Sequence, residues 1–82
     1  MTRTEVMNIL KDTMIQIDPD AKKIIENCSE DSDLSTDLGL DSIEMLSMVI
    51  MMEENHGIDF SDIKMSKIHT VKDVIDYIVS KK

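Results

Sequence analysis

The sequence has few cysteines and aromatic residues, and it has no long apolar run. Its single cysteine, Cys28, excludes an internal disulfide framework and a multi-cysteine zinc site. One tyrosine, one phenylalanine and no tryptophan mean that any hydrophobic core must be aliphatic. No apolar run approaches the roughly 20 residues that span a bilayer, and the N-terminus lacks the apolar segment of a signal peptide. We therefore expect a soluble, cytoplasmic protein.

Basic residues are missing from the middle of the chain. No lysine or arginine occurs between Lys23 and Lys64, while this interval holds eleven of the seventeen acidic residues. The formal net charge is −8 at pH 7. Such a surface keeps a protein soluble and repels the phosphates of nucleic acids. We therefore expect partners that present basic surfaces, and no nucleic acid among them.

Length and hydrophobic content predict one folded domain over residues 1–82. Eighty-two residues lie near the lower limit for a self-sufficient core, and a hydrophobic content of 41% argues against disorder. Eight methionines supply flexible side chains for packing this core.

Three segments have the apolar spacing of helices, from residue 2 to 17, from 42 to about 56, and from about 70 to 79. Each begins with the spacing of a capping box, in which an N-cap residue and an acidic residue three positions later bond each other's backbone N–H. The pairs are Thr2 with Glu5, Asp41 with Glu44, and Thr70 with Asp73. The first and last helices are expected to supply core residues, namely Val6, Ile9, Leu10, Met14, Ile17, Val71, Val74, Ile75, Ile78 and Val79.

We also predict several features of the segments that connect these helices. Asp18 and Pro19 can begin a short helix that runs to about Glu26 and buries Ile24 or Ile25. Leu34, Leu38 and Leu40 should anchor the long loop before the helix 42–56. Gly57 should end that helix, and Phe60 should fill the core after it. Residues 61–65 are expected to form a short helix, and Lys81 and Lys82 suit the C-terminal dipole of the last one.

The stretch 37–44, D-L-G-L-D-S-I-E, has the features of an anion site at a helix N-terminus. Gly39 permits a sharp turn, and Asp41 is a good N-cap. Ser42 then falls at the first helical position, where unpaired N–H groups and the positive end of the helix dipole favour a phosphate ester. In isolation, the Asp41-Ser42 pair is explained more simply if Ser42 is a second capping hydroxyl.

The wider pattern is more specific. D-L-G-L-D-S-I-E followed by M-L-S-M-V-I-M-M-E-E, and later by K-I-H-T-V-K-D-V-I-D-Y-I, resembles the acyl carrier protein family from about residue 34 to 77. The resemblance implies an all-α antiparallel four-helix bundle, with three main helices, a short third helix and a long loop between the first two. It also implies a non-enzymatic carrier in which Ser42, within a motif that includes Asp41, bears 4′-phosphopantetheine. The thiol of this group would carry acyl intermediates as thioesters between enzymes of fatty acid biosynthesis.

The resemblance makes helix 42–56 the partner-recognition helix. Its predicted contacts are the apolar Ile43, Leu46 and Ile50 and the acidic Glu44, Glu53 and Glu54. The implied partners are a phosphopantetheinyl transferase and acyl-processing synthases, reductases, dehydratases and acyltransferases, with the protein as a monomer. The aliphatic interior could shelter the acyl chain. Ser47 stands where many family members have a glutamate, which leaves a polyketide or other specialised pathway as the alternative.

Two readings from other classes remain open. Asp33, Ser35, Asp37, Asp41 and Glu44 match the ligand spacing of an EF-hand, which would make this a small acidic calcium-binding protein. Its sixth position is leucine instead of the glycine that this loop requires, so we expect no metal site. The other reading is a helical module whose acidic helix binds a basic protein. No catalytic constellation is predicted, because no histidine or lysine lies within a few residues of Ser42.

Overall fold

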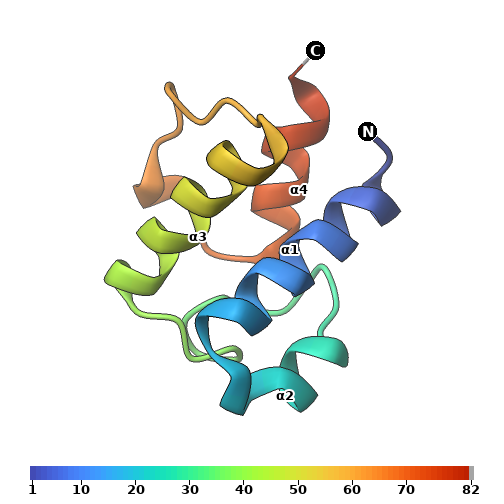
Figure 1. Ribbon diagram of the computed structural model, residues 1–82, viewed down its shortest axis with the longest axis vertical. Coiled ribbons are helices and arrows are strands. Elements are labelled where there is room, and N and C mark those ends of the chain that lie inside the picture. The colour runs from blue at the N-terminus through green and yellow to red at the C-terminus, as the bar shows by residue number, and fades with distance from the viewer. Residues whose placement is uncertain (82) are drawn as a thin grey trace.

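The computed structural model describes residues 1–81, which form helices and connecting loops (Figure 1). The three long helices are α1 (Arg3–Ile17), α3 (Ser42–His56) and α4 (Val71–Ser80). A 3₁₀ helix η1 (Pro19–Ala21) leads into the short α2 (Lys22–Glu26), and a second 3₁₀ helix η2 (Met65–Lys67) precedes α4. The all-α class and the long loop before α3 are confirmed. No helix in the described residues is long and apolar enough to cross a membrane.

All three predicted capping boxes are present. Thr2, Asp41 and Thr70 each accept a hydrogen bond from the backbone N–H three residues later, and the acidic side chain there bonds back to the cap. At the other end of α3, Gly57 takes the left-handed conformation, with a φ of 64°. These local signals therefore fix where the long helices begin and where α3 ends.

The core is aliphatic and lies where α1 crosses the other two long helices. Figure 1 shows α1 running downward against α3 and α4, which both run upward, so α1 is antiparallel to each. The inward faces are interlocked by the flexible methionines of α1 and α3 and by the branched residues of α4. The buried members on these helices are Val6, Leu10, Met14, Met48, Val49, Met52, Val71, Val74, Ile75 and Ile78. The predicted stripe is confirmed except at its margins, where Ile9, Ile17 and Val79 are only partly buried.

The short helix after Pro19 is also confirmed, and the structure settles which isoleucine it buries. Ile25 is fully buried, whereas Ile24 is 57% exposed. Asp18 precedes this segment, but its side chain makes no capping hydrogen bond. The segment is therefore held by packing of Ile25 more than by its own cap.

The predicted helix over residues 61–65 is wrong. Ser61 and Asp62 form a turn, and the helical residues come later, at Met65–Lys67. The turn is fixed from outside: Phe60 stacks on Tyr77 with ring centroids 5.5 Å apart, and the Asp62 carboxylate accepts hydrogen bonds from the Tyr77 hydroxyl and Lys81. Because these contacts hold the chain at its start, the helical turn forms only beyond them.

Lys81 has a different role from the one predicted. Its ammonium lies 2.7 Å from Asp62 Oδ1 and 5.1 Å from the centroid of the Tyr77 ring, so it joins α4 to the loop after α3. Lys82, which was expected to act with it on the helix dipole, lies outside the described residues.

The loop between α2 and α3 is tied to the first turn of α4. The amides of Val71 and Lys72, which have no partner within their own helix, donate to the carbonyls of Ser32 and Glu30 at 3.0 and 2.8 Å. In the opposite direction, the N–H of Leu34 donates to the carbonyl of His69 at 2.9 Å. This loop leads directly to α3, so these bonds place the N-terminus of α3 relative to α4.

Candidate functional site

The N-terminus of α3 is capped by Asp41 and not by Ser42. Asp41 has extended backbone, with φ −91° and ψ −180°, and its Oδ1 accepts a hydrogen bond from the Glu44 N–H at 2.8 Å. Glu44 Oε1 in turn accepts from the Asp41 N–H at 3.2 Å. The capping requirement of the helix is therefore met without the serine.

Ser42 is the first residue of α3, and its side chain is exposed. Within residues 1–81, no side-chain hydrogen bond involves its hydroxyl, whereas Asp41 and Glu44 on either side are both engaged. The hydroxyl thus lies free at the helix end where unpaired N–H groups and the positive dipole favour an anion. The arrangement suits an oxygen that is to be esterified by a phosphate.

The turn into α3 is shaped by glycine and by two buried leucines. Gly39 has a φ of 73°, a left-handed conformation that favours glycine. Its N–H donates to the carbonyl of Ser35 at 3.0 Å. Leu38 and Leu40 on either side of it are both buried, as predicted. Leu38 and Leu40 therefore anchor the loop in the core, while Ser42 remains at the surface.

Asp33 stabilises the start of the same loop. Its carboxylate accepts hydrogen bonds from the N–H groups of Thr36 and Ser35, each at 2.8 Å. These bonds favour the ionised form and hold the pKa of Asp33 below its usual value. Leu34, the next residue, is fully buried, which confirms its predicted role as an anchor.

A pocket with a volume of about 660 Å³ opens beside Ser42. Its apolar wall comes from the loop, from α3 and from the segment around η2, and polar groups complete it. The apolar residues are Leu34, Leu40, Met45, Leu46, Met65 and Ile68, and the polar ones are Asp33, Ser35, Asp41, Ser42 and His69. The exposed serine therefore lies at the edge of a space that an apolar chain could enter.

The η2 side of this pocket was not predicted from the sequence. Met65 and Ile68 line it, together with His69. The available signal was the spacing of the two apolar residues three positions apart, immediately before the cap at Thr70. That spacing matches one side of a 3₁₀ turn. The helix predicted for residues 61–65 would have ended at Met65 and left Ile68 outside it.

The outer face of α3 leaves three large apolar residues in solvent. Ile43 is 77% exposed, Leu46 54% and Ile50 43%. Their spacing of three and four residues places them on one side of the helix. A row of such residues on a small protein marks an interaction surface more often than chance exposure does. All three predicted apolar contact residues are thus accessible.

The three glutamates of α3 are not equivalent. Glu44 is half-buried and belongs to the capping box, and Glu53 Oε2 accepts a hydrogen bond from the Phe60 N–H at 3.3 Å. Glu54 is exposed, and its side chain forms no hydrogen bond or ion pair among the described residues. All the predicted contact residues therefore share one helix, but Glu44 and Glu53 also have structural roles.

The acidic residues of this region do not converge on a cation position. Within residues 1–81, no group of three or more histidine, cysteine, aspartate or glutamate side chains could hold a metal ion. Instead, Asp33, Asp37, Asp41 and Glu44 each accept hydrogen bonds from backbone N–H groups. These carboxylates therefore stabilise the loop and the start of α3.

The site is thus an exposed serine at the N-terminus of a helix in a small helical protein, with a partly apolar pocket beside it. Residues 3–78 match the family model described as "Phosphopantetheine attachment site". The acyl carrier protein of Coprothermobacter proteolyticus is 40% identical over 76 residues, which cover 93% of this chain and 84% of that protein. Those of Campylobacter hominis and Thermosynechococcus vestitus are 35% and 32% identical, over 90% and 99% of this chain and 90% and 96% of their own lengths.

The chain therefore belongs to the acyl carrier protein family. Its members bear phosphopantetheine and are not catalytic, so the protein is a phosphopantetheine-bearing carrier and not an enzyme.

Proposed function

We propose that Ser42 is the residue that carries 4′-phosphopantetheine, joined through a phosphodiester to its Oγ. The observation that supports this proposal is that Asp41 and Glu44 cap α3, whereas Ser42 does not. Asp41 and Glu44 complete the capping box, so the exposed hydroxyl of Ser42 has no structural duty. When bound, the group supplies a terminal thiol that holds an acyl chain as a thioester.

The surroundings of Ser42 fit this group. The positive end of α3 stabilises a phosphodiester there, and the exposed position leaves room for a flexible arm. Asp41 keeps the helix mouth in place and so positions Ser42. A separate phosphopantetheinyl transferase would supply the group from coenzyme A, because members of this family are not catalytic.

The outer face of α3 is proposed as the docking surface for that transferase and for acyl-processing synthases, reductases, dehydratases and acyltransferases. Ile43, Leu46 and Ile50 offer apolar contacts, and the neighbouring glutamates attract basic surfaces. Exposed charges of this kind raise association rates more than affinity and are screened by salt. Docking should therefore be fast, weak and sensitive to ionic strength.

We also propose that the carrier acts as a monomer in the cytoplasm.

The pocket beside Ser42 is proposed as the entrance through which an acyl chain reaches the interior. Met45, Leu46 and Met65 line it, and the flexible methionines can move at low cost. NMR spectra of the protein loaded with a long acyl chain test this, since amides along the pocket should shift relative to the unloaded form. Identical spectra for the two forms would contradict it.

We place this carrier in fatty acid biosynthesis. The relatives are acyl carrier proteins, and the D-L-G-L-D-S pattern resembles that of fatty-acid carriers. Ser47 on α3 favours the second candidate, a specialised acyl pathway such as polyketide synthesis. Intact-mass analysis of the acyl groups bound to the protein from its own cells separates them: saturated linear chains support the first, and oxygen-rich chains support the second.

Incubation with coenzyme A, magnesium and a broad-specificity phosphopantetheinyl transferase tests the attachment site. The wild type should gain the mass of one phosphopantetheine group, and Ser42→Ala should gain none while it keeps its helical circular dichroism. Ser35→Ala is the matched control, because Ser35 is also exposed and lines the same pocket. A Ser42→Ala protein that is still modified would overturn the proposal.

A further inference from the structure

Three of the nine lysine and arginine residues of this acidic protein lie in one short segment. After the interval from residue 24 to 63, which has no lysine or arginine, residues 64–72 contain three lysines, one histidine and no acidic residue. This segment includes η2 and leads into α4. The change of sign thus occurs beside the pocket that adjoins Ser42, because Met65 and Ile68 line that pocket.

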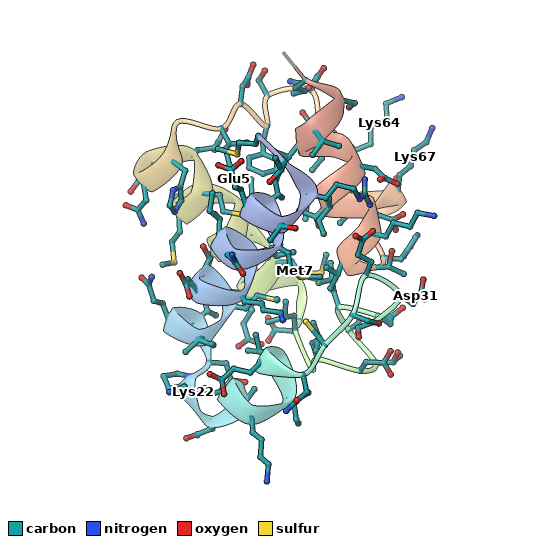
Figure 2. All side chains as sticks on the ribbon, turned by 90° about the vertical axis from the view of Figure 1, so that its right-hand side faces the viewer. Glu5, Met7, Lys22, Asp31, Lys64 and Lys67 are labelled. Carbon is teal, nitrogen blue, oxygen red and sulfur yellow. The ribbon has the colours of Figure 1, made fainter. Side chains whose placement is uncertain are left out.

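Two of these lysines form a continuous exposed edge. The Lys67 N–H donates to the Lys64 carbonyl at 2.9 Å, and the Ile68 N–H donates to the Met65 carbonyl at 3.1 Å. Residues three apart in such a turn lie on the same side, so Met65 and Ile68 face the pocket while Lys64 and Lys67 share another side. Figure 2 shows Lys64 and Lys67 projecting outward from the same side of the molecule.

Neither lysine is neutralised within the described part of the chain. The ion pairs there involve Arg3 and Lys81, and Lys81 already holds the nearby carboxylates of Asp59 and Asp62. Both Lys64 and Lys67 are exposed. Their charges are therefore available to an external group, even though the protein as a whole has an excess of carboxylates.

We propose that Lys64 and Lys67, the η2 edge, form a second docking contact of opposite sign to α3 for an acidic patch on the acyl-processing enzymes that reach Ser42. The inference rests on the proposed function. A partner that receives the arm from Ser42 contacts the surface around that residue, and η2 belongs to this surface because Met65 lines the same pocket as Ser42. Its surface should then be basic opposite α3 and carry carboxylates opposite η2, which fixes its orientation as well as its position. A nucleic acid cannot meet this requirement, because its phosphates are repelled by α3.

Two synthetic helical peptides test the proposal. Both present the same apolar face and the same row of lysines for α3; one ends in three glutamates and the other in three serines. Their affinities for the ¹⁵N-labelled full-length protein are measured by NMR titration at low salt. Each is measured for the wild type, for K64E/K67E and for the control K22E/K23E, which has the same change in net charge on the exposed α2.

We expect K64E/K67E to weaken binding of the glutamate-ended peptide about three- to tenfold, as two exposed charge contacts allow, and K22E/K23E to leave it unchanged. Neither variant should weaken the serine-ended peptide. Equal effects of the two variants, or no effect of K64E/K67E, would overturn the proposal, since the lysines would then act only through net charge. The peptides do not react with Ser42, so this result is independent of the transferase experiment that tests the attachment site.

Discussion

Replacing Asp41 with alanine tests whether Asp41, and not Ser42, stabilises the N-terminus of α3. Asp41→Ala removes the acceptor that lies 2.8 Å from the Glu44 N–H and leaves that donor without its partner. Loss of an N-cap side chain costs about 1 kcal/mol. For a domain of this size, that corresponds to a fall in Tm of roughly 4–8 °C. Asp41→Asn keeps a good cap but removes the charge, so the difference between the two variants isolates the cap.

Ser42→Ala provides the contrast, because the Ser42 hydroxyl has no hydrogen bond among the described residues. Its Tm should stay within about 2–4 °C of the wild type, since surface changes away from such features alter stability by less than about 0.5 kcal/mol. Thermal unfolding followed by circular dichroism at 222 nm measures all three variants. A Ser42→Ala protein that loses as much stability as Asp41→Ala would refute the reasoning, because the serine would then be a structural cap.

Three further predictions concern the elements that hold the site. Leu34→Ala should cost about 2–5 kcal/mol in denaturant unfolding, because the side chain is fully buried; a loss below 1 kcal/mol, by the same scale, would show that it is not an anchor. Gly57→Ala should cost about 1–2 kcal/mol by the same assay through left-handed backbone alone, because a β-carbon there meets open space; an unchanged midpoint would contradict this. Hydrogen bonds from backbone amides lower the pKa of Asp33 and of Asp73, so the folded state binds fewer protons than the unfolded state at acidic pH. The stability that these two residues contribute should be full above the ordinary aspartate pKa of about 3.9 and should fall as the pH drops through their lower folded-state pKa values. A Tm that rises on acidification would refute this direction of the pH dependence.

Much of the fold follows from local sequence signals. The capping boxes, the C-cap at Gly57 and the apolar stripes each depend on residues within one helical turn, so their outcome needs no knowledge of distant contacts. The segment 61–65 could not be predicted in this way. Its conformation depends on Tyr77 and Lys81, which lie more than a dozen residues away and hold Asp62 in the turn.

The candidate site divides along the same line. The position of Ser42 and the exposure of Ile43, Leu46 and Ile50 follow from the helical register of α3 and its cap. The second wall of the pocket does not, because Met65 and Ile68 reach it only once the loop before α3 is tied to the start of α4. The double role of Glu53 was also beyond local prediction, since its partner is the Phe60 amide in the following loop.

The most direct test of the account is fragment-ion mass spectrometry of the protein purified from its own cells. It predicts one phosphopantetheine group, with every fragment that contains Ser42 carrying the added mass and fragments that contain only Ser35 or Ser47 lacking it. A protein that is unmodified under conditions of active acyl synthesis, or that carries the group on another residue, would contradict the assignment of Ser42.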